Sequence, residues 1–414
     1  MIKGYSHLKT GLIGKKLSHS FSPEIHGLLG DHSYELYEME EACVGGFLEK
    51  HPFDALNVTI PYKKTVIPFL DAVSDEAKRI GAVNTVLRRP DGSLFGDNTD
   101  YFGFSYLLSK LGASVAGKKV LVLGSGGASA TAVTVLRDRG AEPVIISRTG
   151  KDNYENLDRH SDAAAIVNTT PVGMYPDNLH SPLSLSHFPC LSFVIDMIYN
   201  PARTSLLLSA ERRGIPYLNG LPMLVAQAAR AVTLFTGEEI AESEIDAVCA
   251  RVSAKMQNIV LIGMPSAGKT TVGKSLASMT GRRFVDSDEV FSERLGITPA
   301  AFIEKNGEGA FRLEETRILT EIARESGCVI ATGGGAVTRR ENKDILRQNG
   351  VTVWLMRDLD RLSDEGRPLS KGKGAIQRLY EKRKPLYEDF ADISYEVNES
   401  DFSLTARKIM EEIL

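Results

Sequence analysis

Several features that would assign this 414-residue chain to a particular class of protein are scarce or missing. The 4 cysteines are scattered and never form a CxxC pair, so no disulfide framework is indicated. No apolar run is long enough to span a bilayer, and the N-terminus lacks the apolar core of a signal peptide. We therefore expect a reducing, cytoplasmic location with free or structural cysteines.

A strong charge of one sign is also missing. The 49 basic and 53 acidic residues leave a net charge of -4, and no basic run occurs. Electrostatics therefore give no reason to expect a nucleic acid or an anionic membrane as a partner. The 8 histidines show no metal-ligand spacing, and no internal repeat is visible. The length leaves room for two or three domains, and nothing in the sequence indicates an oligomeric state.

A glycine-bounded segment in the second half organises the chain. Residues 263–271 read GMPSAGKTT and follow the apolar run 259–262. A helical pattern comes next, and strand, glycine loop, Lys-Thr and helix form the layout of a phosphate-binding P-loop. Lys269 would neutralise the outer phosphates, and the hydroxyl of Thr270 would contact Mg²⁺. Because a P-loop usually follows the first strand of its domain, we expect a new domain to begin near Asn258.

A second glycine loop lies in the first half. Residues 120–123 form an apolar strand, and residues 124–129, GSGGAS, follow G-x-G-x-x-G except at the last position. A helix and a strand at 143–147 are expected next, which is the context of a dinucleotide site. That strand ends in Ser-Arg-Thr at 147–149 rather than in the acid typical of NAD sites. An arginine beside a hydroxyl favours the 2′-phosphate of NADP. The alternative is a glycine turn in a cofactor-free α/β domain.

Weaker signals precede this loop, each a polar side chain near the end of an expected strand. They are Ser20, Ser22, Lys63, Asn84 and Asp100. Together they would suit a small polyhydroxylated acid. Alternatively, Ser22 is a helix N-cap, and Lys63 is a solvated lysine. We expect Lys63 to begin a helix and Asn84 to belong to a strand over 80–85.

These segments resemble shikimate dehydrogenase, over roughly residues 1 to 250. The matching motifs, in the order of the family, are HSFSP at 19–23, NVTIPYK at 57–63, GAVNT at 81–85, GDNTD at 96–100 and MLVAQAA at 223–229. The resemblance implies a substrate-binding domain at 1–105, completed by helices around 222–255, and a Rossmann NADP domain at 106–221. It also implies NADPH-dependent reduction of 3-dehydroshikimate to shikimate, with Lys63 and Asp100 as the catalytic pair.

The same resemblance implies two sets of binding residues. Shikimate would be held by Ser20, Ser22, Thr59, Lys63, Asn84, Asp100, Tyr199 and Gln227. NADP would be held by Gly124, Ser125, Gly126, Gly127, Ala128, Ser147, Arg148, Thr149 and Gly220. The chain departs from the family at Ser147, where asparagine is usual, and at Pro222, where glycine is common. The crossover after Arg148 is also short for a full βαβ repeat.

Further polar motifs follow the P-loop. A short strand is predicted to place Asp286 and Asp288 on one side, although a solvated acidic turn is the alternative. Arg312 lies near the start of a helix, where an anionic ligand would explain a cation. Residues 329–335 form a strand ending in three glycines, which would let a ligand approach closely. Arg367 lies in a polar, glycine-flanked stretch typical of a mobile lid.

This second set resembles shikimate kinase, over about residues 257 to 414. The P-loop, Asp-x-Asp, Gly-Glu-x-x-Phe-Arg, Gly-Gly-Gly, Arg-Pro-Leu and Arg-x-Pro-Leu-Tyr motifs occur in the order of the family. The resemblance implies a P-loop domain with a parallel sheet that phosphorylates shikimate to shikimate 3-phosphate with ATP. Ser266 replaces a loop glycine, and the segment before Arg367 is shorter than the usual lid.

The kinase resemblance also assigns residues. Lys269 and Asp288 would be catalytic, and Thr270 and Asp286 would hold Mg²⁺. ATP would be bound by Ser266, Ala267, Gly268, Lys269, Thr270, Thr271 and Arg367. Shikimate would be bound by Asp288, Arg312, Gly333, Gly334, Gly335 and Arg383, the last expected near a helix end.

Together the two resemblances predict an α/β enzyme that catalyses two consecutive steps toward chorismate and the aromatic amino acids. Two alternatives stay open. One is a quinate-preferring dehydrogenase fused to another small-molecule kinase. The other is a regulatory protein in which one half binds its ligand without catalysis. The partners expected in each case are small molecules.

Overall fold

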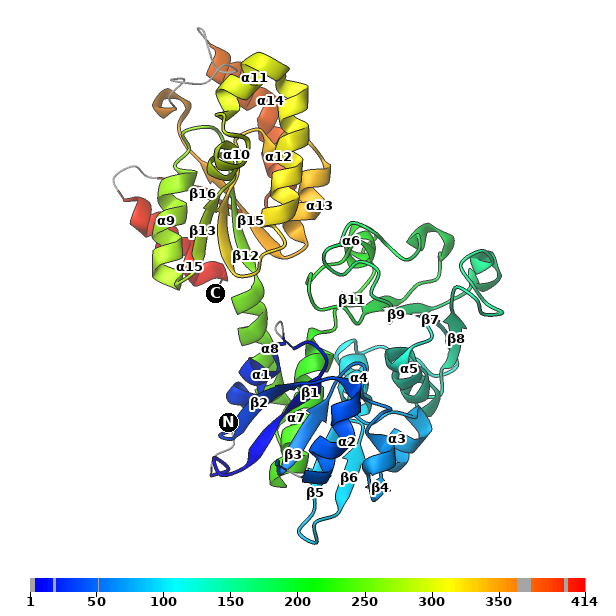
Figure 1. The fold of residues 1–414 in the computed structure, drawn as a ribbon. Coiled ribbons are helices and arrows are strands. Elements are labelled where there is room, and N and C mark those ends of the chain that lie inside the picture. The colour runs from blue at the N-terminus through cyan, green and yellow to red at the C-terminus, as the bar shows by residue number, and fades with distance from the viewer. Residues whose placement is uncertain (1–3, 18–19, 51, 363–373, 398–400, 414) are drawn as a thin grey trace. The chain divides into compact units, whose positions relative to one another are not determined.

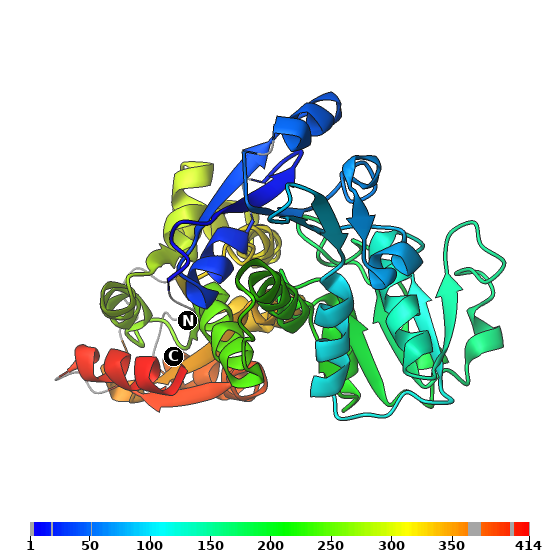
Figure 2. The ribbon, with the colours of Figure 1, turned by 90° about the horizontal axis from the view of Figure 1, so that it is seen from below.

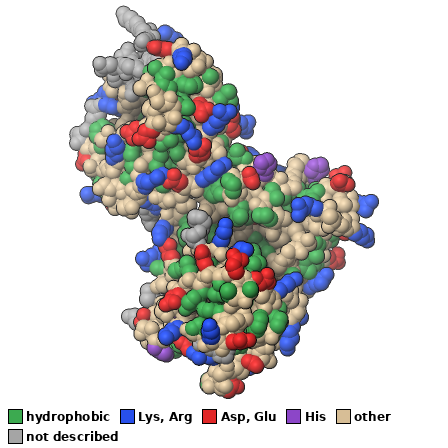
Figure 3. Space-filling model, in the orientation of Figure 1, with side chains coloured by type: hydrophobic (Ala, Val, Ile, Leu, Met, Phe, Trp, Pro, Cys, Tyr) green, Lys and Arg blue, Asp and Glu red, His purple; other side chains and the backbone are tan. Residues whose placement is uncertain are grey.

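The computed structural model describes residues 4–17, 20–50, 52–362, 374–397 and 401–413 (Figure 1). The chain divides into two compact units. The first consists of Met1–Met174, His180–Tyr199 and Leu206–Val252, and the second of Tyr175–Leu179, Asn200–Ser205 and Ser253–Leu414. Within the described ranges, no helix is both long enough and apolar enough to cross a bilayer. Basic and acidic side chains are interspersed over the face seen in Figure 3.

A mixed six-stranded sheet opens the first unit, in the order β2-β1-β3-β5-β6-β4. Its strands are β1 (Lys9–Gly14), β2 (Ser33–Glu38), β3 (Ala55–Val58), β4 (Ala72–Val73), β5 (Thr85–Arg88) and β6 (Leu94–Asp97). Its helices are α1 (Ser22–Leu29), α2 (Glu41–Lys50) and α3 (Asp75–Ile80). β1 pairs with β2 and β3 in parallel, whereas β5 is antiparallel to β3 and β6. Leu48, Phe53 and Tyr62 are fully buried in the core between this sheet and α2.

Two local predictions in this sheet are wrong. The strand expected over 80–85 is absent, because α3 runs to Ile80 and Gly81 ends it with a left-handed φ of 72°. Regular pairing in this segment begins only at Thr85, so Asn84 lies just before β5. Lys63 does not begin an α-helix but lies in a series of turns after β3. Both residues are therefore held by irregular backbone, where local sequence patterns are weakest.

A pair of histidines, His26 buried and His32 half-buried, should make this region sensitive to pH. His26 Nδ1 lies 3.1 Å from His32 Nε2, and the His26 ring stacks on Tyr34 with 3.9 Å between ring centroids. Burial, and then the charge of His32, holds the pKa of His26 well below its usual value. Burial also lowers the pKa of His32, although Asp31 opposes that shift.

The expected result is a loss of stability in mild acid. As pH falls below about 6.5, these histidines bind protons in the unfolded chain but not in the folded one. The free energy of unfolding this region therefore falls by up to about 1.4 kcal/mol per pH unit for each histidine. The loss continues down to the folded pKa values. Hydrogen exchange of the α1 amides between pH 7.5 and 5.5 measures this slope. His26→Phe should flatten it, and an unchanged slope in that variant would contradict the assignment.

A fully parallel sheet forms the rest of the first unit, in the order β11-β10-β9-β7-β8. Its strands are β7 (Lys119–Leu123), β8 (Glu142–Ile146), β9 (Ala165–Asn168), β10 (Phe193–Asp196) and β11 (Tyr217–Leu218). Its helices are α5 (Gly127–Asp138) and α6 (Ser205–Arg212). The crossover from β8 to β9 contains only a short 3₁₀ helix, Leu157–His160, so the predicted abbreviation of this crossover is confirmed.

Two long helices connect these sheets in the first unit. They are α4 (Asp100–Lys110) and α7 (Leu221–Thr236), and α8 (Glu242–Met256) follows them. A Cβ atom on Gly103 of α4 would lie 2.6 Å from the carbonyl oxygen of Met223 on α7, so only glycine allows this close approach. Phe104 and Leu107 of α4 also pack in the core of the parallel sheet. The two sheets occupy separate parts of the unit in Figure 2.

The second unit is built on another parallel sheet, in the order β13-β14-β12-β15-β16. Its strands are β12 (Asn258–Ile262), β13 (Arg283–Asp286), β14 (Cys328–Ala331), β15 (Gly350–Met356) and β16 (Ile393–Glu396). Its helices are α9 (Lys269–Thr280), α10 (Ser287–Leu295), α11 (Pro299–Asn306), α12 (Glu308–Ile322), α13 (Glu341–Arg347), α14 (Ala375–Phe390) and α15 (Phe402–Ile413).

Helices cover both faces of this sheet (Figure 1). On one face, Leu276 of α9 and Ile409 of α15 pack against the strands. On the other face, Ile318 of α12, Ile345 of α13 and Tyr387 of α14 do so. The predicted α/β architecture with parallel sheets is thereby confirmed. Because all strands are parallel, their carboxyl ends share one edge, where ligand sites of such folds form.

Candidate active sites

A lysine and a carboxylate form an ion pair in the first unit. Lys63 Nζ lies 2.5 Å from Asp100 Oδ2, and both side chains are partly buried. The carbonyl of Lys63 accepts a 2.8 Å hydrogen bond from Val83 N–H, and Asp100 N–H donates to Asn98 Oδ1 at 3.1 Å. The turn after β3 and the first residue of α4 thus bring the pair together. A cation held by a carboxylate in this way can deliver a proton to a bound substrate.

Asn84 and Gln227 join this pair through Thr99. The Asn84 side-chain oxygen accepts from the Thr99 N–H at 2.7 Å and from the Thr85 hydroxyl at 3.1 Å. The Thr99 hydroxyl lies within hydrogen-bond distance of both Asn84 Oδ1, at 3.2 Å, and Gln227 Oε1, at 3.3 Å. These bonds determine which way each amide faces. The structure therefore brings together four of the predicted substrate residues from the turn after β3, the residue before β5, α4 and α7.

The predicted serines flank Phe21, whose ring contacts that of Tyr199. α1 begins at Ser22 itself, and its N-cap is Phe21, so the alternative of Ser22 as an N-cap is wrong. Ser20 Oγ accepts the Ser22 N–H at 3.2 Å. The rings of Phe21 and Tyr199 meet edge to face, with centroids 6.0 Å apart. Thr59 directly follows β3, and its N–H donates to the Ile13 carbonyl at 3.0 Å.

The glycine loop of the first unit joins β7 to α5. Gly124 has a left-handed φ of 106°, and a Cβ atom there would lie 2.8 Å from Thr169 Oγ1, so the position requires glycine. Gly126 is the N-cap of α5 and has open space around its α-carbon. Arg148 and Thr149 are exposed just after β8, at the same carboxyl edge of the sheet. Packing explains why residue 220 is a glycine, because a Cβ atom there would lie 2.0 Å from the Met197 carbonyl oxygen.

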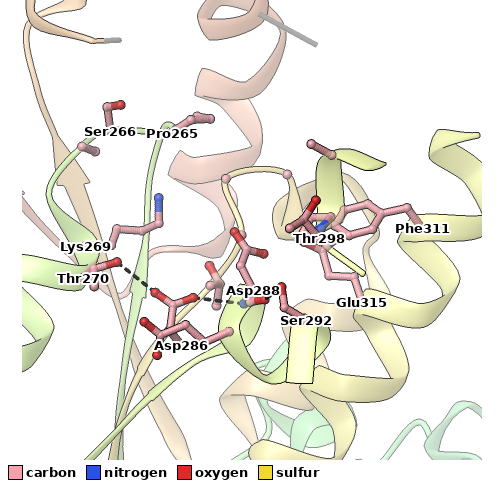
Figure 4. A pocket seen from close by; sticks show the side chains of 18 of the residues that line it. Pro265, Ser266, Lys269, Thr270, Asp286, Asp288, Ser292, Thr298, Phe311 and Glu315 are labelled. Carbon is pink, nitrogen blue, oxygen red and sulfur yellow. Dashed lines mark hydrogen bonds between the residues drawn. The ribbon is translucent and has the colours of Figure 1, made fainter. Parts of the chain in front are cut away.

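A cavity of about 940 Å³ lies at the carboxyl edge of the sheet in the second unit. Figure 4 shows Ser266, Lys269 and Thr270 on one side of it and Thr298, Phe311 and Glu315 on the other. Lys269 Nζ donates to the carbonyls of Gly263 at 3.0 Å and Met264 at 2.9 Å, so it lies folded against its own loop. The lining of this one cavity combines residues predicted to bind phosphate with residues predicted to bind the acceptor.

The two aspartates share this cavity, although the geometry differs from the prediction. β13 ends at Asp286, and Asp288 belongs to the first turn of α10, so they do not share one side of a strand. Asp286 caps α10 by accepting the Asp288 N–H at 3.0 Å. Its other oxygen accepts the Thr270 hydroxyl at 2.9 Å (Figure 4). A strand pattern could not anticipate that a helix begins between them.

Arg312 is already paired within its helix. Its guanidinium contacts Glu315 Oε2 at 2.8 Å and Glu308 Oε1 at 3.1 Å. Burial lowers the pKa of Arg312, but the two glutamates outweigh that effect and raise it overall. Burial also raises the pKa of the Glu315 carboxyl, against the influence of Arg312. The two glutamates are thus one reason for a cation at this place on the helix, and the expected anionic ligand stays a prediction.

Two of the three glycines, Gly333 and Gly335, make room for this ion pair. A Cβ atom on Gly335 would lie 2.0 Å from Arg312 Nη2, and one on Gly333 would lie 2.5 Å from Glu315 Oε1. The carbonyl of Gly334 accepts from Arg383 Nη1 at 3.1 Å. Arg383 lies in the middle of α14 rather than near its end, and burial lowers its pKa. Both arginines line the cavity, and each is held by side-chain or backbone acceptors.

Comparison with known proteins identifies the first part of the chain. Residues 12–86 match the family model of the shikimate dehydrogenase substrate binding domain. A shikimate dehydrogenase (NADP(+)) of Clostridium beijerinckii is 37% identical over 241 residues, which are 53% of this chain and 89% of that relative. The chain belongs to the shikimate dehydrogenase family.

Solved structures agree with this assignment. A chorismate mutase/shikimate 5-dehydrogenase fusion protein from Clostridium acetobutylicum is 34% identical, with a TM-score of 0.57 over 59% of this chain and 97% of that one. A shikimate 5-dehydrogenase from Thermus thermophilus, in complex with NADP(H) and shikimate, is 33% identical, with a TM-score of 0.54 over 61% and 99%. Residues 265–414 match the family model of shikimate kinase. The protein is therefore a bifunctional enzyme of the shikimate pathway.

Several residues of these sites were not predicted. In the dehydrogenase part, Thr85 and Thr99 orient the amide of Asn84, and nothing local to either threonine signals that role. In the kinase part, Glu315 is buried beside Arg312. Its spacing of three residues on a predicted helix was a usable signal, since such pairs are neighbours on a helix surface. The predicted ATP residue Arg367 lies outside the described residues.

Proposed function

We propose that the first unit reduces 3-dehydroshikimate to shikimate with NADPH. The observation that carries this proposal is the Lys63–Asp100 pair, flanked by Asn84 and Gln227. Lys63 donates a proton to the carbonyl oxygen as that oxygen gains charge, and Asp100 holds the ammonium in place. The bound cofactor supplies the hydride. Residues 1–105, with helices around 222–255, would bind the substrate.

Residues 106–221 would bind NADP, and the loop after β7 fits that role. The crowded left-handed Gly124 keeps the loop close to the sheet, and the N-terminus of α5 follows directly. Backbone N–H groups at a helix N-terminus hold a pyrophosphate. Arg148 would contact the 2′-phosphate from the end of β8, with Ser147 and Thr149 beside it.

Arg148 should determine cofactor choice. Arg148→Ala removes charge-assisted bonds that contribute about 1.5–3 kcal/mol toward a 2′-phosphate. The apparent KM for NADPH should therefore rise, while the KM for NADH, which lacks that phosphate, should change little. Initial-rate assays with both cofactors test this difference. Equal effects on the two cofactors would show that Arg148 has a structural role.

The second unit, over about residues 257 to 414, is proposed to transfer the γ-phosphate of ATP to the 3-hydroxyl of shikimate. The supporting observation is one cavity lined by the P-loop, Asp288, Arg312 and Arg383. Asp288 accepts a hydrogen bond from the hydroxyl and receives its proton as the new O–P bond forms and ADP leaves. The arginines bind the carboxylate, because a guanidinium donates a planar pair of bonds.

The Thr270 hydroxyl and the Asp286 carboxylate fit a role in holding Mg²⁺. They lie 2.9 Å apart beside the P-loop, and Mg²⁺ typically takes one or two such ligands together with waters and substrate phosphates. Over the described residues there is no cluster of three or more His, Cys, Asp or Glu side chains for a metal. Lys269 would leave its loop carbonyls to neutralise the phosphates, with Ser266, Ala267, Gly268 and Thr271 around them.

A coupled assay tests both proposals at once. Purified protein with NADPH, 3-dehydroshikimate and ATP should yield shikimate 3-phosphate. Oxidation of quinate in preference to shikimate would favour the quinate alternative, and shikimate accumulating without phosphorylation would identify a catalytically inactive second unit.

All four cysteines are free thiols in the structure, which supports the proposed cytoplasmic location.

A further inference from the structure

The P-loop of the second unit contains an unusual backbone conformation. Ser266 has φ of 63° and is the one non-glycine residue with positive φ in the part of the chain that the structure describes. In this left-handed region a Cβ atom crowds the following carbonyl, so glycine normally occupies it. Such strained residues persist only where surrounding contacts hold them, and they gather at functional sites.

An arginine supplies such a contact. The Arg357 guanidinium donates a hydrogen bond from Nη1 to the Ser266 carbonyl oxygen. Arg357 is the first residue after β15, and β15 pairs with β12, the strand that leads into the P-loop. Neighbouring parallel strands therefore deliver the arginine and the loop to the same edge of the sheet. A hydrogen bond from a charged donor is roughly twice as strong as a neutral one.

Both residues face the nucleotide side of the kinase cavity. Arg357 lines this cavity together with Ser266, Ala267 and Gly268. The direction of the Ser266 carbonyl determines how the adjoining peptide planes turn, and hence where the loop N–H groups point. A loop that cradles a polyphosphate needs those N–H groups directed into the cavity.

We infer that Arg357 is a positioning residue of the kinase site. Its guanidinium holds Ser266 in the left-handed conformation and so maintains the P-loop in the shape that receives ATP. This contact compensates for serine at a place where the loop would otherwise use glycine. The inference rests on the proposed kinase function, and it concerns nucleotide binding rather than the acceptor.

The first test is Arg357→Ala in the full-length protein. The KM for ATP should rise roughly tenfold at saturating shikimate, which is the effect of losing one charge-assisted hydrogen bond. The KM for shikimate and the dehydrogenase rate should stay within about twofold, and the latter reports that the chain is folded. Arg357→Lys keeps the charge without the planar fork and should give an intermediate KM for ATP. Arg340→Ala, an exposed arginine outside the cavity, is the matched control and should change nothing.

The second test separates positioning from direct contact with phosphate. Glycine adopts positive φ unaided, so in a Ser266→Gly background the loss of Arg357 should raise the KM for ATP less than about threefold. An equal penalty in both backgrounds would overturn the inference, since it would mean that Arg357 binds the nucleotide directly. An unchanged KM for ATP in Arg357→Ala would overturn it as well. Absence of kinase activity in the unsubstituted protein would instead contradict the proposed function.

Discussion

Replacing Lys63 by alanine is expected to lower the rate of 3-dehydroshikimate reduction roughly 10²–10⁴-fold, the range for loss of a positioned proton donor. The ammonium lies 2.5 Å from Asp100, and the Lys63 backbone is tied to Val83. The position of Lys63 is therefore determined by contacts at both its ammonium group and its backbone. Because NADPH does not depend on Lys63 for binding in this scheme, kcat should fall much more than the KM for NADPH changes. Stopped-flow or steady-state measurement of NADPH absorbance gives both quantities.

Lys64 provides the matched control. It is the next residue in the chain, carries the same charge and is exposed, so Lys64→Ala should leave reduction unchanged. Kinase activity should persist in both variants, because the P-loop cavity lies in the other unit. Near-normal reduction by Lys63→Ala would remove the lysine from the mechanism. A loss of both activities would point to misfolding, which circular dichroism would detect.

Arg312→Ala is expected to raise the KM for shikimate in the kinase reaction roughly 10- to 150-fold, since it removes a charged donor contributing about 1.5–3 kcal/mol. ADP should still bind, because the P-loop is untouched. The structure adds a second consequence. Arg312 neutralises Glu315, whose side chain is 3% exposed, so its removal leaves an uncompensated buried charge that costs roughly 3–5 kcal/mol of stability.

Two further variants separate acceptor binding from this loss of stability. Arg312→Ala combined with Glu315→Gln removes the unpaired charge and should recover much of the stability while shikimate binding stays weak. Arg317→Ala alters an arginine of the same helix that is 72% exposed and paired with Glu314, and it should affect neither property. Kinase assays at varied shikimate, with calorimetric titration of ADP, measure both ligands. An unchanged KM for shikimate, or a loss of ADP binding, would contradict the assignment of Arg312 to shikimate binding.

The sequence anticipated elements that obey strong local rules. The P-loop pattern required a loop between a strand and a helix, and such a loop joins β12 to α9. Gly263 lies in this loop, and Lys269 and Thr270 are the first residues of α9. The parallel strands were visible as short apolar runs because both of their faces are buried. The predictions failed where one element ends and the next begins. Asn84 follows a helix end rather than lying in a strand, and Asp288 belongs to a helix rather than to the strand of Asp286.

By itself the sequence determined the α/β class, the two glycine loops and the residue types that carry each chemistry, because these depend on periodicity and on short motifs. Only the tertiary structure decided which side chains meet. Gln227 reaches Thr99 from α7, Tyr199 reaches Phe21, and Arg357 reaches Ser266 from the neighbouring strand. The physical reason is that strand order and helix packing, rather than spacing along the chain, determine which residues at a sheet edge become neighbours.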